Sequence, residues 1–486
     1  MNVNTFDQDA SGLGASERKN GQDDRSPGER KRDAKTRVVV VGPYLTDRAA
    51  TYALREKGRG EKGLGEKALR SQEARLDEAE GLALAINVEV VGRELVSLGQ
   101  IRPATYLGKG KVEELAALVA DREADLVVVD CALSPVQQRN LEKAFSAKVI
   151  DRTGLILEIF GERARTAEGA MQVELAHLTY QKSRLVRSWT HLERQRGGFG
   201  FLGGPGETQI ETDRRLIQER MTRIERDLEG VKKTRGLHRK SRRDVPFPVV
   251  ALVGYTNAGK STLFNTLTKS DVFAKDLLFA TLDPTLRGLK MPHGGRIILS
   301  DTVGFISDLP TMLVSAFRAT LEEVLEADVI LHVRDIAHED ADAQGADVEK
   351  ILAELGVDPQ DHDRLIEVWN KIDLLPEEER ERLRNSAARR PEDERPSVVS
   401  AVSGEGLGDL LQAIETRLAR GRVLLSVPIE AADGEGQAWL YAHTEVMARN
   451  ADEEGGALFE IRIAPEQQDR VLRRFPGAEA IGSIAP

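Results

Sequence analysis

The chain has 486 residues, with 69 Lys and Arg against 80 Asp and Glu, a net charge of −11, and one cysteine, Cys131. It contains no apolar run near the roughly 18 residues that a membrane-spanning helix needs, and a lone cysteine excludes a disulfide scaffold. The length predicts two to four domains. Because the polar, acidic N-terminus lacks the apolar stretch of a secretory signal, we expect a cytoplasmic protein.

The first 160 residues predict a tail followed by one domain. Residues 1–36 are polar and glycine-rich and are expected to be disordered. Residues 37–160 alternate apolar runs with amphipathic stretches, which predicts an N-terminal α/β domain with a parallel sheet. Its expected strands are 37–45, 88–91, 126–130 and 148–151, and its expected helices 76–86, 112–119 and 135–144. A charged, glycine-rich insertion is expected near 55–73.

Residues 161–245 predict a long antiparallel helical hairpin. Apolar residues recur at helical spacing over 166–194 and 208–243. Between them, 196–207 hold many glycines and are expected to form an irregular tip. Residues 213–243 contain twelve Lys and Arg against five acids, a local net charge of +7. This basic hairpin favours contact with RNA phosphates, although a solvated face with alternating charge pairs remains open.

Residues 246–422 read as strand, glycine loop and helix followed by further α/β units, and 423–486 as a small C-terminal α/β domain. In the latter we expect apolar strands at 423–427 and 457–463 and a helix near 467–474.

A phosphate-binding loop is the strongest motif. Gly254, Gly259, Lys260 and Ser261 follow an apolar run and open a helical segment. Backbone N–H groups can surround the phosphates, the lysine can approach the β and γ phosphates, and the serine hydroxyl can bind Mg²⁺. By contrast, residues 108–111 (GKGK) lack the full pattern, which favours a turn or an RNA contact over a second phosphate site.

Three further elements follow strand-like runs, where ligands of parallel sheets bind. They begin at Asp301, Asn370 and Ser400. Asp301 can hold magnesium through water, and the Gly304 amide can meet a γ phosphate. The stretch Asn370-Lys371-Ile372-Asp373 selects guanine, because the Asp373 carboxylate can accept from N1–H and the 2-amino group, and adenine offers neither donor. The sequence therefore predicts binding of GTP and GDP.

These residues resemble those of the Ras-like, translation-factor-related GTPases and, more closely, the HflX subfamily. Its markers are GGPGETQIETDRR from Gly203, FATLDPT from Phe279 and YLGKGKVEEL from Tyr106. The resemblance spans about residues 36–486. It implies an α/β fold in which a P-loop GTPase domain is preceded by an N-terminal α/β domain and a long antiparallel helical hairpin, and followed by a small C-terminal α/β domain.

By position, the resemblance makes Phe279 to Asp283 the first switch and Asp301 to Gly304 the second. It assigns Lys260, Thr281 and Gly304 to catalysis and Ser261 and Thr281 to Mg²⁺. The expected nucleotide contacts are Gly254, Tyr255, Thr256, Asn257, Ala258, Gly259, Lys260, Ser261, Phe279, Ala280, Thr281, Leu282, Asp283, Asp301, Thr302, Val303, Gly304, Asn370, Lys371, Ile372, Asp373, Ser400, Ala401 and Val402.

One position departs from Ras-like relatives. Phe305 follows Gly304, where a glutamine would orient the attacking water, and an apolar ring cannot do so. We expect slow intrinsic hydrolysis. Asn257 resembles the asparagine that holds potassium in some GTPases without that glutamine. The alternative, that Asn257 only shapes the loop, stays open.

The resemblance also implies partners. Similar proteins bind the ribosome, chiefly the large subunit and its rRNA, in splitting or rescue of ribosomes, protein synthesis or ribosome biogenesis. We expect a monomer without an integral membrane segment, and leave peripheral membrane association open. One rival interpretation is a GTP-dependent switch for a protein partner without RNA contact. Another is an accessory of RNA modification or unwinding with a second nucleotide site.

Overall fold

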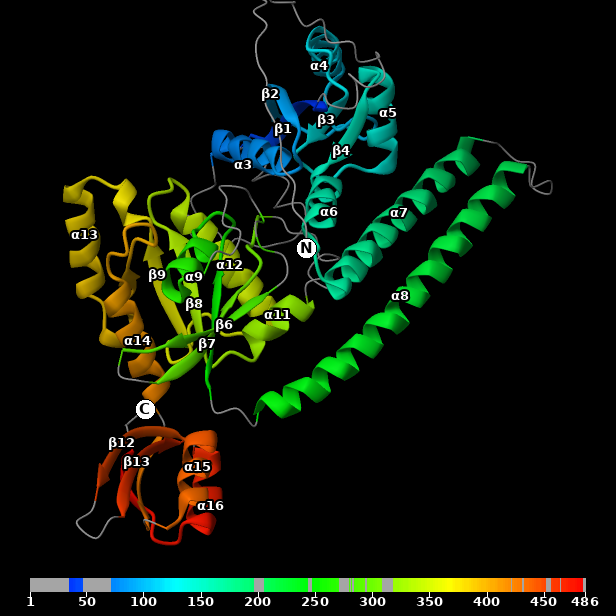
Figure 1. Ribbon diagram of the computed structural model, residues 1–486. Helices are drawn as coiled ribbons and strands as arrows, with labels where there is room; N and C mark the ends of the chain where they lie inside the picture. The colour runs from blue at the N-terminus through cyan, green and yellow to red at the C-terminus, as the bar shows by residue number, and fades with distance from the viewer. Residues whose placement is uncertain are drawn as a thin grey trace, which may run out of the picture.

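The computed structural model contains three β-sheets, and a helical hairpin lies in the chain between the first and the second (Figure 1). It describes residues 35–46, 71–195, 205–243, 247–270, 279, 281, 284–292, 295–307, 318–420, 422–430, 432–451, 456–463 and 465–483. Most of the predicted tail and most of the predicted insertion therefore lie outside the described residues. Within the described part of the chain, no helix is long and apolar enough to cross a membrane.

The first sheet is parallel, with strand order β2-β1-β3-β4. Residues 38–41 are four consecutive valines with no exposed surface. Val38 and Val40 pack with α3 and α6, whereas Val39 and Val41 pack with α4 and α5, because successive strand residues face opposite sides. The elements are β1 Arg37–Leu45, α3 Gln72–Leu84, β2 Glu89–Leu98, α4 Lys109–Asp121, β3 Leu126–Val129, α5 Pro135–Phe145, β4 Lys148–Asp151 and α6 Arg152–Arg163.

The helical hairpin consists of α7 Ala167–Gln195 and α8 Pro205–Arg243, which lie side by side (Figure 1). Met221, Ile224 and Leu228 are buried at helical spacing on α8. Arg220 of α8 also donates to Glu174 of α7 across 2.7 Å. The tip prediction was wrong for 205–207, because proline suits the first helical position and α8 begins at Pro205. Residues 196–204 lie outside the described residues.

The second sheet has strand order β10-β9-β8-β5-β7-β6 and is parallel except for the β6–β7 pair. Helices α9 and α14 pack on one face, and α11 and α12 on the other. Its elements are β5 Val249–Gly254, α9 Lys260–Thr268, β6 Thr285–Lys290, β7 Arg296–Asp301, α11 Arg318–Leu325, β8 Val329–Asp335, α12 Ala341–Leu355, β9 Leu365–Asn370, η2 Ile372–Leu374, α13 Glu377–Ala388, η3 Glu392–Glu394, β10 Ser397–Val398 and α14 Leu407–Ala419.

The third sheet is antiparallel, with strand order β12-β13-β11-β14. Its core includes Phe459 and Ile461 from β13 and Leu440 and Val471 from the two helices. The expected strands and helix of this segment are confirmed, and the structure adds α15, β12 and β14. The elements are β11 Val423–Ile429, α15 Gly434–His443, β12 Glu445–Ala451, β13 Ala457–Ile463, α16 Pro465–Arg474 and β14 Glu479–Ser483.

Several boundaries differ from the sequence predictions. Helix α3 begins at Gln72 because the Ser71 hydroxyl accepts from the Ala74 N–H, so the last residues of the predicted insertion are helical. Helix α4 begins at Lys109 with Gly108 as its N-cap, so GKGK forms a helix start rather than a turn. Strand β2 extends to Leu98, seven residues beyond its predicted end, because it pairs with β1 along its whole length.

Candidate functional site

The phosphate loop leaves the central strand β5 and enters α9. Gly254 has φ +153, and a Cβ there would lie 2.1 Å from the Val333 carbonyl oxygen of β8. Gly259 has φ +91, and a Cβ there would lie 2.3 Å from Asn370 Nδ2. Only glycine fits either position. The loop is therefore pressed against the ends of two neighbouring strands.

Lys260 begins α9 and is 5 % exposed. Its Nζ donates to the carbonyl oxygens of Gly254 at 3.1 Å and Tyr255 at 2.8 Å. These bonds hold the ammonium group inside the curve of the loop. A point charge placed there can attract the phosphates of a nucleotide.

Three predicted side chains converge beside this lysine. Ser261 Oγ donates to Asp301 Oδ2 at 2.7 Å, Thr281 Oγ1 donates to the same oxygen at 2.9 Å, and the two hydroxyls are 2.8 Å apart. Asp301 has no exposed surface, and its Oδ1 has no hydrogen-bond partner among the described residues. Two hydroxyls and a carboxylate are oxygen ligands of the kind that Mg²⁺ prefers. The residues present fit a magnesium site.

Burial disfavours the charged forms of both ionisable groups. It lowers the pKa of Lys260 to about 8, although Asp301 acts in the opposite direction. It also raises the pKa of Asp301 against the hydrogen bond from Ser261 and the charge of Lys260. Bound phosphates would stabilise the ammonium, and a bound cation would stabilise the carboxylate. The site is therefore electrostatically suited to a nucleotide together with a divalent cation.

Asn370 connects the phosphate loop to the loop after β10. Its Nδ2 donates to the Ala258 carbonyl oxygen at 2.8 Å, and its Oδ1 accepts from the Ala401 N–H at 3.0 Å. Lys371 has φ +68 and forms an ion pair of 2.8 Å with Asp335. Asn370, Lys371 and Ala401, which belong to the set predicted to bind guanine, thus lie at the carboxyl ends of neighbouring strands, and Asp373 follows within the short helix η2. Asp335 was missed, although its position at the end of the buried strand β8 is a usable signal.

The structure describes the second predicted switch fully and the first only in part. Phe279 and Thr281 are described, whereas Ala280, Leu282 and Asp283 lie outside the described residues. Gly304 lies against the phosphate loop, since a Cβ there would be 2.9 Å from Thr256 Cα and 3.0 Å from Lys260 Nζ. Phe305 is 1 % exposed within the apolar core, so its ring is not available to orient water.

The N-terminal α/β unit contacts this site directly. Phe160 of α6 packs edge-on against Phe279, with 4.7 Å between ring centroids. Arg152 donates to Glu78, and to the carbonyl oxygen of Ser307 at 3.1 Å and its hydroxyl at 3.2 Å. Sequence reasoning missed these contacts, because no local pattern reports that α3 and α6 meet residues of the GTPase region that lie far away along the chain.

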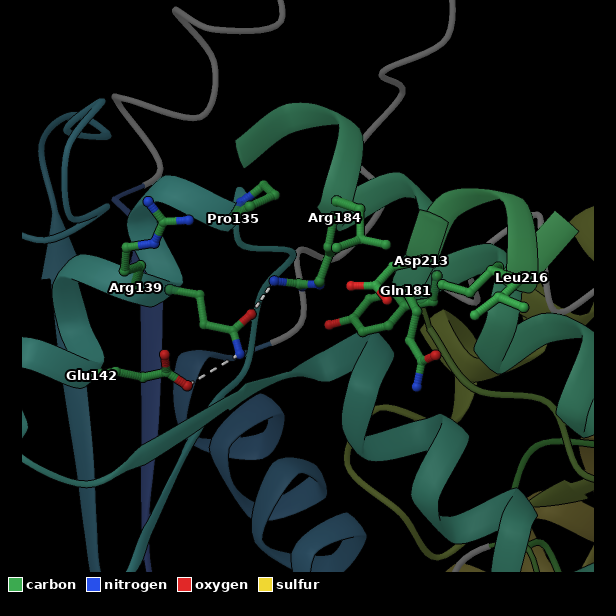
Figure 2. A pocket seen from close by; sticks show the side chains of 11 residues that line it. Pro135, Arg139, Glu142, Gln181, Arg184, Asp213 and Leu216 are labelled. Carbon is green, nitrogen blue, oxygen red and sulfur yellow. Dashed lines mark hydrogen bonds between the residues drawn. The ribbon is translucent and has the colours of Figure 1, made fainter. Parts of the chain in front are cut away.

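Two cavities lie next to helices of the N-terminal α/β unit. One, of about 500 Å³, lies between α3 and the phosphate loop and is lined by Glu78, Thr256 and Asn257 among others. Figure 2 shows the other, of about 580 Å³, where α5 meets the hairpin; the labelled Arg139 and Glu142 come from α5, and Arg184 and Leu216 from the hairpin. Arg184 is already engaged there, since it donates to Gln138 and, at 2.6 Å, to Asp151.

The chain matches four known protein families. Residues 73–161 match the family described as GTP-binding GTPase N-terminal, and 163–242 its middle region. Residues 249–371 match the family described as 50S ribosome-binding GTPase, and 387–481 the HflX C-terminal domain.

Curated relatives span most of the chain. A GTPase HflX of Magnetococcus marinus is 52 % identical over 402 residues, which cover 83 % of this chain and 90 % of the relative. A GTPase HflX of Escherichia coli is 43 % identical over 403 residues, covering 82 % and 92 %. Among solved structures, a GTP-binding protein from Sulfolobus solfataricus in complex with GDP has a TM-score of 0.41 and 22 % identity over 79 % of this chain and 98 % of that one, which is too distant to carry an argument. The two HflX relatives and the four matched families show that this chain belongs to the HflX family of GTPases and that it binds and hydrolyses GTP.

Proposed function

We propose that this GTPase is a nucleotide-dependent ribosome-binding switch in the cytoplasm. It would bind chiefly the large subunit, as a monomer, and act in splitting or rescue of ribosomes, protein synthesis or ribosome biogenesis. The observation that carries the proposal is the match of the nucleotide-binding region to a family described as 50S ribosome-binding GTPase. Contacts of the switch residue Phe279 and of Ser307, shortly after the second switch, with the N-terminal unit support it, because they link the nucleotide site to the part of the chain expected to reach rRNA.

In this proposal the residues from Gly254 to Ser261 hold the phosphates, and Asn370, Lys371 and Asp373 with the loop at 400–402 hold guanine. Ser261 and Thr281 would hold Mg²⁺ directly and Asp301 through water. The bound ion would neutralise charge on the phosphate oxygens. Lys260 would place its positive charge at the β and γ phosphates, where negative charge develops during transfer. The backbone of Gly304 would meet the γ phosphate and report its presence.

Exposed arginines on α8 support an RNA partner. Arg223 and Arg226 are exposed, and neither forms an ion pair with another described residue. Arg215 pairs with Glu219 at 3.7 Å and Arg220 pairs across the hairpin, so the alternative of paired charges holds for only part of this helix. Exposed guanidinium groups along one helix can follow a phosphate backbone.

Co-sedimentation with ribosomal subunits tests the proposal. Binding should be stronger with a non-hydrolysable GTP analogue than with GDP and should weaken steeply with salt. Arg223→Glu with Arg226→Glu should reduce binding at least about tenfold, since each lost phosphate contact weakens it. The matched control, Arg382→Glu on α13 with Arg389→Glu at its C-cap, changes two exposed arginines of the GTPase region and should have little effect. A nucleotide-independent and salt-independent association would instead favour the protein-partner alternative.

Potassium is a second proposed cofactor. Asn257 is an exposed residue of the phosphate loop and has φ +60, a conformation that asparagine tolerates. Its side chain is therefore accessible to a cation, while its backbone conformation also suits the role of shaping the loop. Turnover should be faster in potassium than in sodium at equal ionic strength, and equal rates would leave only the structural role.

A further inference from the structure

We infer that Tyr255 is a positioning residue for the GTPase reaction: its hydroxyl, held by Glu78, keeps the segment after Gly304 against the phosphate loop and thereby favours nucleotides that carry a γ phosphate. The inference depends on the GTPase activity of the family and does not depend on the ribosome. Tyr255 lies within the phosphate loop, but its hydroxyl bonds away from the loop's own backbone.

The segment after Gly304 is attached to the loop at three points. The Thr256 N–H donates to the Phe305 carbonyl oxygen at 2.7 Å, and the Phe305 N–H donates to the Gly254 carbonyl oxygen at 3.1 Å. Two residues further on, the Ser307 N–H donates to the Tyr255 hydroxyl at 2.8 Å. The first two bonds use only backbone atoms, so the tyrosine supplies the side-chain attachment.

The hydroxyl is oriented by its second partner. An ionised carboxylate only accepts, so Tyr255 must donate to Glu78 and can then accept from Ser307. Glu78 is itself buried and paired with Arg152, and it also accepts from the Ser307 hydroxyl at 3.1 Å. The carboxylate therefore has a fixed position, and a phenylalanine at 255 would lose both bonds while keeping the ring in the core.

This attachment places Gly304 beside the lysine of the loop. A Cβ on Gly304 would lie 3.0 Å from Lys260 Nζ, so the glycine backbone already adjoins the group that meets the phosphates. Binding a γ phosphate then requires little further ordering of this segment, and a binding-competent state that is already populated raises apparent affinity. GDP has no γ phosphate and gains nothing from the attachment.

The test compares nucleotide selectivity in Tyr255→Phe and in a matched control. Affinities for fluorescent GDP and a fluorescent non-hydrolysable GTP analogue would be measured for the full chain with Mg²⁺. Losing a hydrogen bond to the charged Glu78 network should weaken binding of the GTP analogue about five- to tenfold and change GDP binding less than about twofold. Tyr44→Phe removes a comparable hydroxyl bond, of 2.6 Å to Asp130 in the same network, without touching Ser307. It should leave selectivity unchanged.

Equal weakening of both nucleotides, an unchanged selectivity in Tyr255→Phe, or the same shift in Tyr44→Phe would overturn the inference. If Tyr255→Phe does not fold, Glu78→Gln provides the measurement. A neutral amide still accepts from the hydroxyl but more weakly than a carboxylate, so a smaller loss of GTP selectivity is expected there. An unchanged selectivity in that variant would also contradict the inference.

Discussion

Arg152 offers the sharpest test of how the N-terminal unit is attached to the GTPase site. It donates to Asp130 at 2.5 Å and to Glu78, and the three side chains are only 8 %, 3 % and 7 % exposed. Burial lowers the pKa of Arg152, but the two carboxylates outweigh that effect and raise it, so the guanidinium stays charged. Arg152→Met would leave two buried carboxylates without their common partner.

Removing one member of such a buried charged group costs about 3–5 kcal/mol. For a cooperatively unfolding unit of about 150–250 residues, this loss of unfolding free energy corresponds to a fall of roughly 6–20 °C in the unfolding midpoint. Replacing all three members, by Arg152→Met with Asp130→Asn and Glu78→Gln, removes the uncompensated charges and should restore at least about half of the loss. Thermal unfolding followed by circular dichroism measures both variants.

Arg93→Met is the matched control. Arg93 also bridges two acids, Asp77 and Glu80, but it is 44 % exposed, so its loss should cost less than about 1 kcal/mol. The reasoning fails if Arg152→Met costs no more than Arg93→Met, or if the triple variant is as unstable as the single one.

Three further outcomes follow, two from the nucleotide site and one from His332, a buried residue of β8. Lys260→Ala should weaken GTP binding by about 10- to 100-fold by removing a charge at the phosphates, and normal affinity in equilibrium titrations would contradict the loop assignment. Asp373→Asn should lower GTP affinity at least about 100-fold and raise that of xanthosine triphosphate, measured by competition; retained guanine preference would refute the assignment. Burial lowers the pKa of His332 from 6.5 to about 4. The contribution of its neutral imidazole to the free energy of unfolding is therefore fully present above pH 6.5, and it is lost toward pH 4 as the unfolded chain takes up the proton. The free energy of unfolding of His332→Leu, measured with urea, should lack the part of this decline that His332 causes, on the order of 3 kcal/mol. A difference between the variant and the parent protein that does not change with pH would refute this.

The nucleotide loops could be predicted because their chemistry is local. The phosphate loop needs glycines at positive φ and a lysine and serine at fixed spacing, and all lie within eight residues of Gly254. Helix boundaries were harder to predict from the sequence. Pro205 and Ser71 start helices through a proline ring and a capping hydroxyl, and those local preferences compete with the glycine-rich sequence beside them.

The sequence alone therefore determined the α/β class, the basic character of the hairpin, the family and the candidate residues for nucleotide binding, since each depends on composition or on short spacing. Tertiary structure decided which distant groups meet. Glu78, Arg152 and Ser307 come from three separate segments, and Phe160 meets Phe279 only because α6 packs toward the second sheet. Burial makes the loss of such a contact destabilising, because a charge or hydroxyl that is removed from water needs the hydrogen-bond partner that the fold provides.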